Sequence, residues 1–118
     1  MRAPGPPPPG RENDSRRVPR YPFLVGVEVA DESGIQIQGQ TKDLSIFGCS
    51  VDTTNPFPQG TRVKIKIAHA GQNFESFGRV AYAHPNSGMG IVFTSVEPQN
   101  DRVLEWWIAD LAQGLNSR

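Results

Sequence analysis

Apolar and polar residues alternate with a period of two along most of residues 21–93, as they do in strands that are buried on one face. The pattern predicts six strands, over residues 21–29, 35–41, 49–53, 63–67, 74–83 and 89–93. Segments rich in Gly, Pro, Asn and Asp separate several of them, at residues 31–34, 55–60 and 84–88. Six short strands with turn residues between them predict a mainly β domain, folded as an antiparallel barrel or sandwich.

The C-terminal segment has helical spacing instead. Pro98 suits the first position of a helix, and Asp101 in the first turn complements the helix dipole. Apolar residues then recur at steps of three and four, at Leu104, Trp107, Ile108, Leu111 and Leu115. This stripe predicts one C-terminal α-helix that covers one end of the β domain.

Trp106 lies off the apolar stripe of this helix, nearly opposite the line through Leu104 and Leu111. Two interpretations remain open for it. The side chain either packs against a loop or the barrel rim, or contacts a partner or a second copy of the chain in a homodimer.

The N-terminal residues differ in composition from the rest of the chain. Five of the first ten residues are proline, which favours extended chain without a core, so residues 1–15 are expected to form a disordered tail and residues 16–118 the domain. Residues 1–20 contain five arginines and two acidic residues, a net charge of +3, although the whole chain has a formal net charge of +0. This positive charge lies on the segment that directly precedes the first expected strand.

Length and composition exclude several classes of protein. A chain of 118 residues has room for one domain. The single cysteine, Cys49, is expected to be a small buried strand residue, and no signal peptide or membrane-spanning run is evident, which favours a cytoplasmic protein without membrane contact. His69 and His84 are expected to be solvated loop residues, since neither has partners for a metal site or a nucleophile. We therefore expect no enzyme, no metal and no cofactor.

A nucleic-acid-binding barrel is also disfavoured. Arg62, Lys64 and Lys66 form a basic strand face, but aliphatic core residues rather than aromatic residues alternate with them.

Two short motifs carry the candidate binding chemistry. The first contains Arg16, Arg17 and Arg20, and the second is the Asp-x-Ser-x-x-Gly sequence over residues 43–48. Guanidinium groups can pair with phosphate and with the O6/N7 edge of guanine, and a carboxylate can accept from the guanine N1–H and N2–H₂ groups. Alternatively, Asp43 and Ser45 could only satisfy backbone amides in a turn.

The two motifs together resemble the signature of the PilZ domain family, in which Arg-x-x-x-Arg precedes the first strand and Asp/Asn-x-Ser-x-x-Gly follows the second. Arg16 and Arg20 match the first motif, Arg17 is the frequent additional arginine, and Asp43, Ser45 and Gly48 match the second. The resemblance implies a six-stranded split β-barrel with a C-terminal helix. It also implies a receptor that binds cyclic di-GMP through these six residues.

In this interpretation the ligand orders the N-terminal arm, residues 11–20, and the ordered arm changes the surface seen by a downstream effector protein in motility, pilus assembly or exopolysaccharide export. Gly48 is expected to allow a positive φ or a close approach of the ligand. The alternative is a PilZ-like adaptor that binds only protein.

Overall fold

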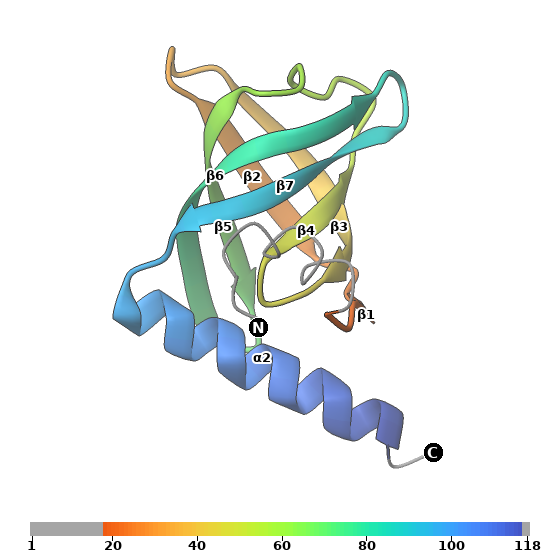
Figure 1. Ribbon diagram of the computed structural model, residues 1–118, viewed down its shortest axis with the longest axis vertical. Coiled ribbons are helices and arrows are strands. Elements are labelled where there is room, and N and C mark those ends of the chain that lie inside the picture. The colour runs from red at the N-terminus through yellow and green to blue at the C-terminus, as the bar shows by residue number, and fades with distance from the viewer. Residues whose placement is uncertain (1–17, 117–118) are drawn as a thin grey trace, which may run out of the picture.

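Six antiparallel strands close into a barrel in the computed structural model, which describes residues 18–116 and the side chains of residues 18–114 (Figure 1). The strands are β2 (Gly26–Asp31), β3 (Gln36–Leu44), β4 (Gly48–Asp52), β5 (Arg62–His69), β6 (Gln72–His84) and β7 (Gly88–Ser95). Around the ring their order is β3-β2-β5-β6-β7-β4, and β4 pairs with β3 to close it. The barrel is thus confirmed over the sandwich. The expected tail, Arg16 and Arg17 lie outside the described residues.

The first expected strand is divided in the structure. A two-residue strand, β1 (Tyr21–Pro22), pairs with β3 outside the barrel, and β2 begins only at Gly26. Between them the hydroxyl of Thr41 contacts the carbonyl oxygen of Phe23 and accepts from the Val25 N–H at 3.1 Å. The expectation of one continuous strand is therefore wrong, because a buried side-chain hydroxyl replaces part of the backbone ladder here.

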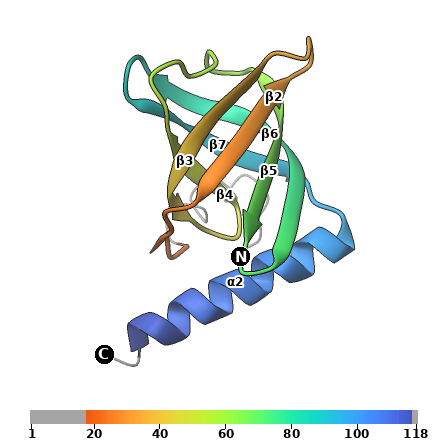
Figure 2. The same ribbon diagram turned by 180° about the vertical axis from the view of Figure 1, so that it is seen from behind.

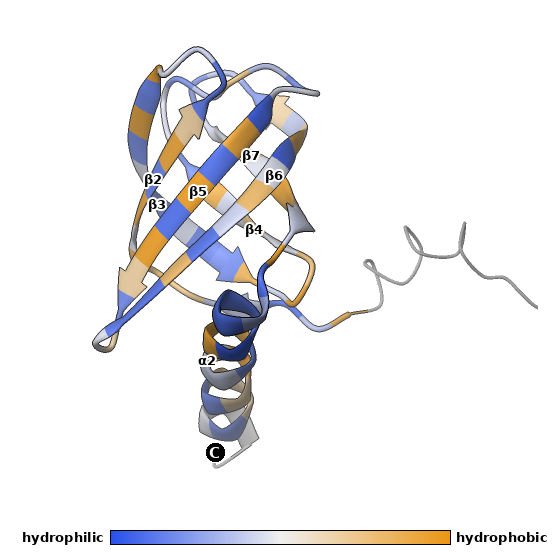
Figure 3. Cartoon of the chain, turned by 90° about the vertical axis from the view of Figure 1, so that its left-hand side faces the viewer, coloured by the Kyte–Doolittle hydropathy of each residue, from blue (hydrophilic) through white to orange (hydrophobic). Residues whose placement is uncertain are grey.

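Alternation places one face of each strand in the barrel interior, visible as alternating bands along β5 in Figure 3. Val29, Ile65 and Phe74 are completely buried. Ile35 departs from the expected pattern and is 59% exposed, because it belongs to the β2–β3 turn and β3 begins only at Gln36. Asp31 closes that turn by accepting from the N–H groups of Ser33 and Ile35, both at 3.0 Å.

Within the described residues one helix, α2 (Pro98–Asn116), lies across one end of the barrel, and its C-terminal part extends beyond the barrel in both views (Figures 1 and 2). It begins at the expected proline. Trp107 inserts from it between the rings of Phe23 and Phe74, with centroids at 5.5 and 6.1 Å. Asn100 in its first turn accepts from the Glu75 N–H at 2.9 Å, where β6 runs past the end of β7. Packing and this hydrogen bond together fix the helix on the barrel.

Three further expectations concern single side chains. Trp106 is 57% exposed, so it does not pack into the core. Cys49 is buried in β4 as expected. His69 and His84 are exposed but end β5 and β6 rather than occupying loops, and the His69 ring contacts Phe23 and Trp107 edge-on, at 5.0 and 5.5 Å between centroids.

The described residues contain no group of three His, Cys, Asp or Glu side chains placed to hold a metal ion. Within the same part of the chain, no helix combines the length and apolarity needed to cross a membrane.

Candidate functional site

The Asp-x-Ser-x-x-Gly motif forms the connection between β3 and β4. The Ser45 hydroxyl accepts from the N–H groups of Phe47 and Gly48, at 3.1 and 3.3 Å, and the Ser45 N–H donates to the Gly48 carbonyl at 2.8 Å. Ser45 is only 3% exposed. Its hydroxyl is thus engaged in holding the turn, which is the structural interpretation left open for this residue from the sequence.

Gly48 is required by strand packing rather than by an unusual backbone angle. It is absent from the described glycines with positive φ, which are Gly34, Gly60 and Gly71. A Cβ at position 48 would instead meet the carbonyl oxygen of Ile91 on β7, well inside contact distance. The sequence-based expectation of a positive φ is therefore wrong, and the close approach that Gly48 permits is to the β7 backbone.

Asp43 of the second motif forms an ion pair with Arg20 of the first motif. Arg20 Nη1 lies 3.3 Å from Asp43 Oδ1, and the two side chains remain 48% and 29% exposed. The structure thus brings Arg20 and Asp43 together from positions 23 residues apart. Arg16 and Arg17 belong to the same arginine cluster in sequence, four and three residues before Arg20.

Strand register extends Asp43 into a row of residues that crosses the outside of the barrel. Pro22 pairs with Asp43, Asp43 with Ser50, Ser50 with Gly90, and Gly90 with Tyr82. The Ser50 hydroxyl and the Tyr82 hydroxyl are hydrogen-bonded at 3.2 Å. Gly90 leaves room for the Tyr82 ring, which occupies the space that a Cβ would need. A carboxylate and two hydroxyls therefore line one face of the barrel.

Two cavities flank this row. The smaller, about 40 Å³, is lined by Arg20, Ser45, Gly48 and Tyr82 among others. The larger, about 260 Å³, lies on the other side of Tyr82 and is lined by Lys42, Ser50, Tyr82, His84 and neighbouring residues of β7. Tyr82 is 40% exposed and its ring lies 5.3 Å from that of His84. The site thus offers an aromatic surface between two recesses.

Ser50, Tyr82 and Lys42 were missed by sequence reasoning. Their signal in the sequence is slight: Ser50 alternates with the buried Cys49 and Val51, so it could have been assigned to the outer face. Lys42 falls at a register shift between Thr41 and Asp43, an irregularity that a single sequence does not reveal.

Cys49 lies beneath the site and is not part of its reactive surface. Burial raises the pKa of its thiol to about 12, with a smaller raising effect from the Asp43 carboxylate and a lowering effect from Arg20. A thiol with so high a pKa is protonated at neutral pH and unreactive. Cys49 is therefore not an activated nucleophile at this site.

Comparison with known proteins identifies the family. The PilZ domain model matches residues 14–110, and no curated protein sequence matches the chain. A solved PilZ domain of CeSA from a cellulose synthesizing bacterium is 28% identical, with a TM-score of 0.66, over 80% of this chain and 98% of that one.

Two further solved structures share the fold. The PilZ domain of Escherichia coli YcgR with c-di-GMP is 15% identical, with a TM-score of 0.68, over 86% of this chain and 95% of that one. The Bacillus subtilis inhibitor of motility, MotI/DgrA, is 17% identical, with a TM-score of 0.68, over 87% of this chain and 52% of that one. The family model covers most of the sequence, and the chain belongs to the PilZ domain family, which consists of binding and adaptor domains.

Proposed function

We propose that this protein is a cytoplasmic receptor for cyclic di-GMP that signals to a partner protein. The observation that carries the proposal is the pairing of Arg20 with Asp43 on the outer face of the barrel, which joins the two sequence motifs in one place. Further support comes from the PilZ domain of YcgR, a structure with the same fold that contains c-di-GMP.

Arg20 and Asp43 provide complementary contacts for guanine. The guanidinium donates to O6 and N7, and the carboxylate accepts from N1–H and N2–H₂, groups that adenine does not present in this arrangement. Both side chains are partly exposed, so separating them costs little, about 0–1 kcal/mol for an exposed ion pair. The ligand then replaces one exposed ion pair with two sets of directed hydrogen bonds.

The remaining motif residues support these contacts. Arg16 and Arg17 supply additional guanidinium groups for the two phosphodiesters or for stacking on a base. Ser45 and Gly48 act mainly by holding the β3–β4 turn, which fixes the position of Asp43 at the end of β3. Tyr82 presents an aromatic surface beside Arg20, and Lys42 adds a cation in the adjacent cavity.

Binding is transmitted through the N-terminal arm. Without ligand, charge repulsion among the arginines opposes a compact arm, and the negative charge of the ligand removes this repulsion. Residues 11–20 then become ordered against the barrel and present a changed surface to an effector protein.

Calorimetric titration of the full chain with cyclic di-GMP tests the proposal. We expect saturable binding, a loss of at least tenfold in affinity for Arg20→Ala and for Asp43→Ala, and no binding of cyclic di-AMP. Lys66→Ala is the matched control, because Lys66 is exposed on β5 away from the motifs and should retain full affinity.

Circular dichroism of each variant checks that the barrel is folded. A folded wild-type protein that produces no heat with cyclic di-GMP contradicts the receptor proposal and supports the adaptor that binds only protein. Equal losses in Lys66→Ala and Asp43→Ala would contradict the proposed site.

A further inference from the structure

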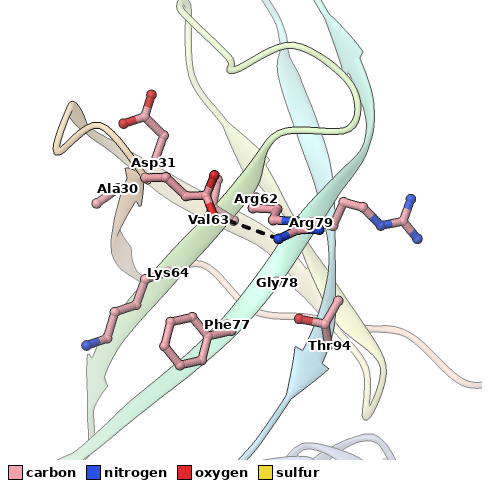
Figure 4. A pocket seen from close by; sticks show the side chains of 10 residues that line it. Ala30, Asp31, Arg62, Val63, Lys64, Phe77, Gly78, Arg79 and Thr94 are labelled. Atoms are coloured by element: carbon pink, nitrogen blue, oxygen red, sulfur yellow. Dashed lines mark ion pairs between the residues drawn. The ribbon is translucent and has the colours of Figure 1, made fainter.

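A second surface, separate from the motif site, carries a cavity of about 540 Å³ (Figure 4). Its lining comes mainly from β5 and β6, which lie across the ring of strands from β4 and β3. No residue that lines it also lines either cavity beside Asp43. The lining includes three cationic side chains and one aromatic side chain, those of Arg62, Lys64, Arg79 and Phe77.

The arrangement of these side chains is unfavourable for the free protein. Arg62 and Arg79 are directly opposite each other in the β5–β6 register, where like charges repel. Phe77 is 56% exposed, and Lys64 opposite it lies over its ring at 5.8 Å. A large apolar ring in water beside two opposed guanidinium groups is typical of a surface that becomes covered by a partner.

Acidic side chains compensate only part of this surface. Lys64 pairs with Glu75 at 3.5 Å, whereas Arg62 meets Glu32 only at 4.0 Å, with both side chains at least 75% exposed. Arg79 has no ion pair within the described residues. In Figure 4 the Arg79 side chain extends away from Phe77.

The acidic residues at the rim compensate part of the positive charge of the cavity. The Asp31 carboxylate accepts from Ser33 Oγ at 2.8 Å and from the N–H groups of Ser33 and Ile35, which lowers its pKa and keeps it ionised. Asp31 and Glu32 thus set two negative charges against the three cations of the lining, which retains a net charge of +1.

A β-bulge shapes the floor beside Phe77. Phe77 pairs with Ser95 and Gly78 with Phe93, which leaves Thr94 of β7 as an extra residue that lines the cavity. Such bulges redirect side chains and are frequent beside binding sites. Beside the cavity, Lys64 of β5 and Phe77 of β6 are each paired on both sides, so a ligand there must be recognised by side chains and not by adding a strand.

We propose that this surface binds an extended acidic segment of a partner protein that has an acidic residue two positions from an apolar residue. The Arg62/Arg79 and Lys64/Phe77 pairs are two residues apart along the hairpin, about 7 Å at the rise of a β-strand. Alternate side chains of an extended segment have the same spacing. One side chain of the bound segment can therefore place its carboxylate at the two arginines. The side chain two positions along, on the same face of the segment, then packs its apolar group on Phe77.

Selection from an unbiased peptide-display library against the full chain tests this inference, which does not depend on the nucleotide. We expect enriched peptides to contain Asp or Glu two positions from an aromatic or aliphatic residue. Binding of a labelled enriched peptide, followed by fluorescence anisotropy, should weaken at least tenfold in Arg79→Glu and in Phe77→Ser. It should change less than twofold in Lys66→Glu, an equal charge reversal on the same sheet face but outside the cavity.

Several outcomes would overturn the proposal. These are enrichment of no peptide, enrichment of peptides without acidic residues, equal weakening in Lys66→Glu, and no effect of Phe77→Ser in a protein shown to be folded. Competition with inorganic pyrophosphate tests whether the surface binds anions without recognising an apolar group. If pyrophosphate displaces the peptide and binds equally well to Phe77→Ser, the surface is an unspecific anion patch and the proposed apolar recognition is wrong.

Discussion

Gly48 shows how a residue of a binding motif can serve the fold at the scale of a single atom. Its missing Cβ leaves room for the Ile91 carbonyl of the neighbouring strand. We predict that Gly48→Ala lowers the free energy of unfolding by about 1–3 kcal/mol, the usual cost of overpacking. Denaturant unfolding of the wild type and Gly48→Ala measures this loss in the free energy of unfolding.

Gly26→Ala is the matched control for this substitution. A Cβ at Gly26 meets nothing within 4 Å, its φ is not positive, and it also lies at the start of a strand. The free energy of unfolding of Gly26→Ala should differ from that of the wild type by less than about 0.5 kcal/mol, as for an ordinary surface substitution. If both variants lost the same stability, the close contact with Ile91 would not be the cause.

Cys49 gives the protein a pH dependence on the alkaline side. The pKa of its thiol is raised from 9.0 to about 12, chiefly by burial. A raised pKa stabilises the fold fully below pH 9, and this contribution is lost as the pH rises from 9 toward 12. Over this window we predict that the unfolding equilibrium shifts by roughly tenfold per pH unit relative to Cys49→Ala.

Urea unfolding of both proteins at pH 8, 9 and 10 measures this difference. Parallel stability curves for wild type and Cys49→Ala above pH 9 would show that the buried thiol titrates as it does in the unfolded chain. A thiol reagent added at pH 7.5 provides a second check, because the folded wild type should react only at the rate of unfolding.

At the scale of elements, Thr41 holds the break between β1 and β2. Its hydroxyl contacts the Phe23 carbonyl and accepts from the Val25 N–H, and the residue is completely buried. Thr41→Val keeps the shape but leaves these backbone groups without a partner, so we predict a loss of about 1–3 kcal/mol. Hydrogen exchange should accelerate first at Val25. Unchanged exchange there would mean that water or a shifted backbone replaces the hydroxyl.

This element also shows the limit of what one sequence predicts. Alternation of apolar residues identified the strands and most of their buried faces, because burial acts on each residue locally. The break before Gly26 and the exposure of Ile35 depend on hydrogen bonds made by Thr41 and Asp31 to other segments. The period-two alternation of apolar and polar residues does not reveal these hydrogen bonds.

The candidate site, like the fold, could be predicted only in part from the sequence. The two motifs placed Arg20 and Asp43 in one site, and the structure brings them to 3.3 Å. The row through Ser50, Gly90 and Tyr82 follows from strand register, which brings Ser50 to Gly90 and Tyr82, 40 and 32 positions further along the chain. The roles of Ser45 and Gly48 required the hydrogen bonds and the packing of β4 on β7.

At the scale of the whole molecule, ligand binding should stabilise the barrel. A ligand that binds only the folded state adds about 2.7 kcal/mol at a concentration of 100 Kd. For a domain of about 100 residues this corresponds to a rise in Tm of roughly 10 °C or more. We predict this rise with cyclic di-GMP for wild type and about half of it or less for Asp43→Ala, whose affinity falls at least tenfold. A similar rise with cyclic di-AMP would mean that the base is not recognised.

The proposed output requires a change in the N-terminal arm that the rigid barrel does not share. In the proposed complex, arginine side chains that would repel one another before binding gain a common anionic partner, so we expect the arm to lose conformational freedom on binding. We predict that heteronuclear NOE values rise for residues 11–20 on addition of cyclic di-GMP and stay constant in β2 and β5, most of whose residues are paired on both sides. At a ligand concentration near the wild-type Kd, Asp43→Ala should show a much smaller rise. Saturable binding without any change in these residues would separate recognition from the arm, and the signal would then have to reach the partner through the barrel surface itself.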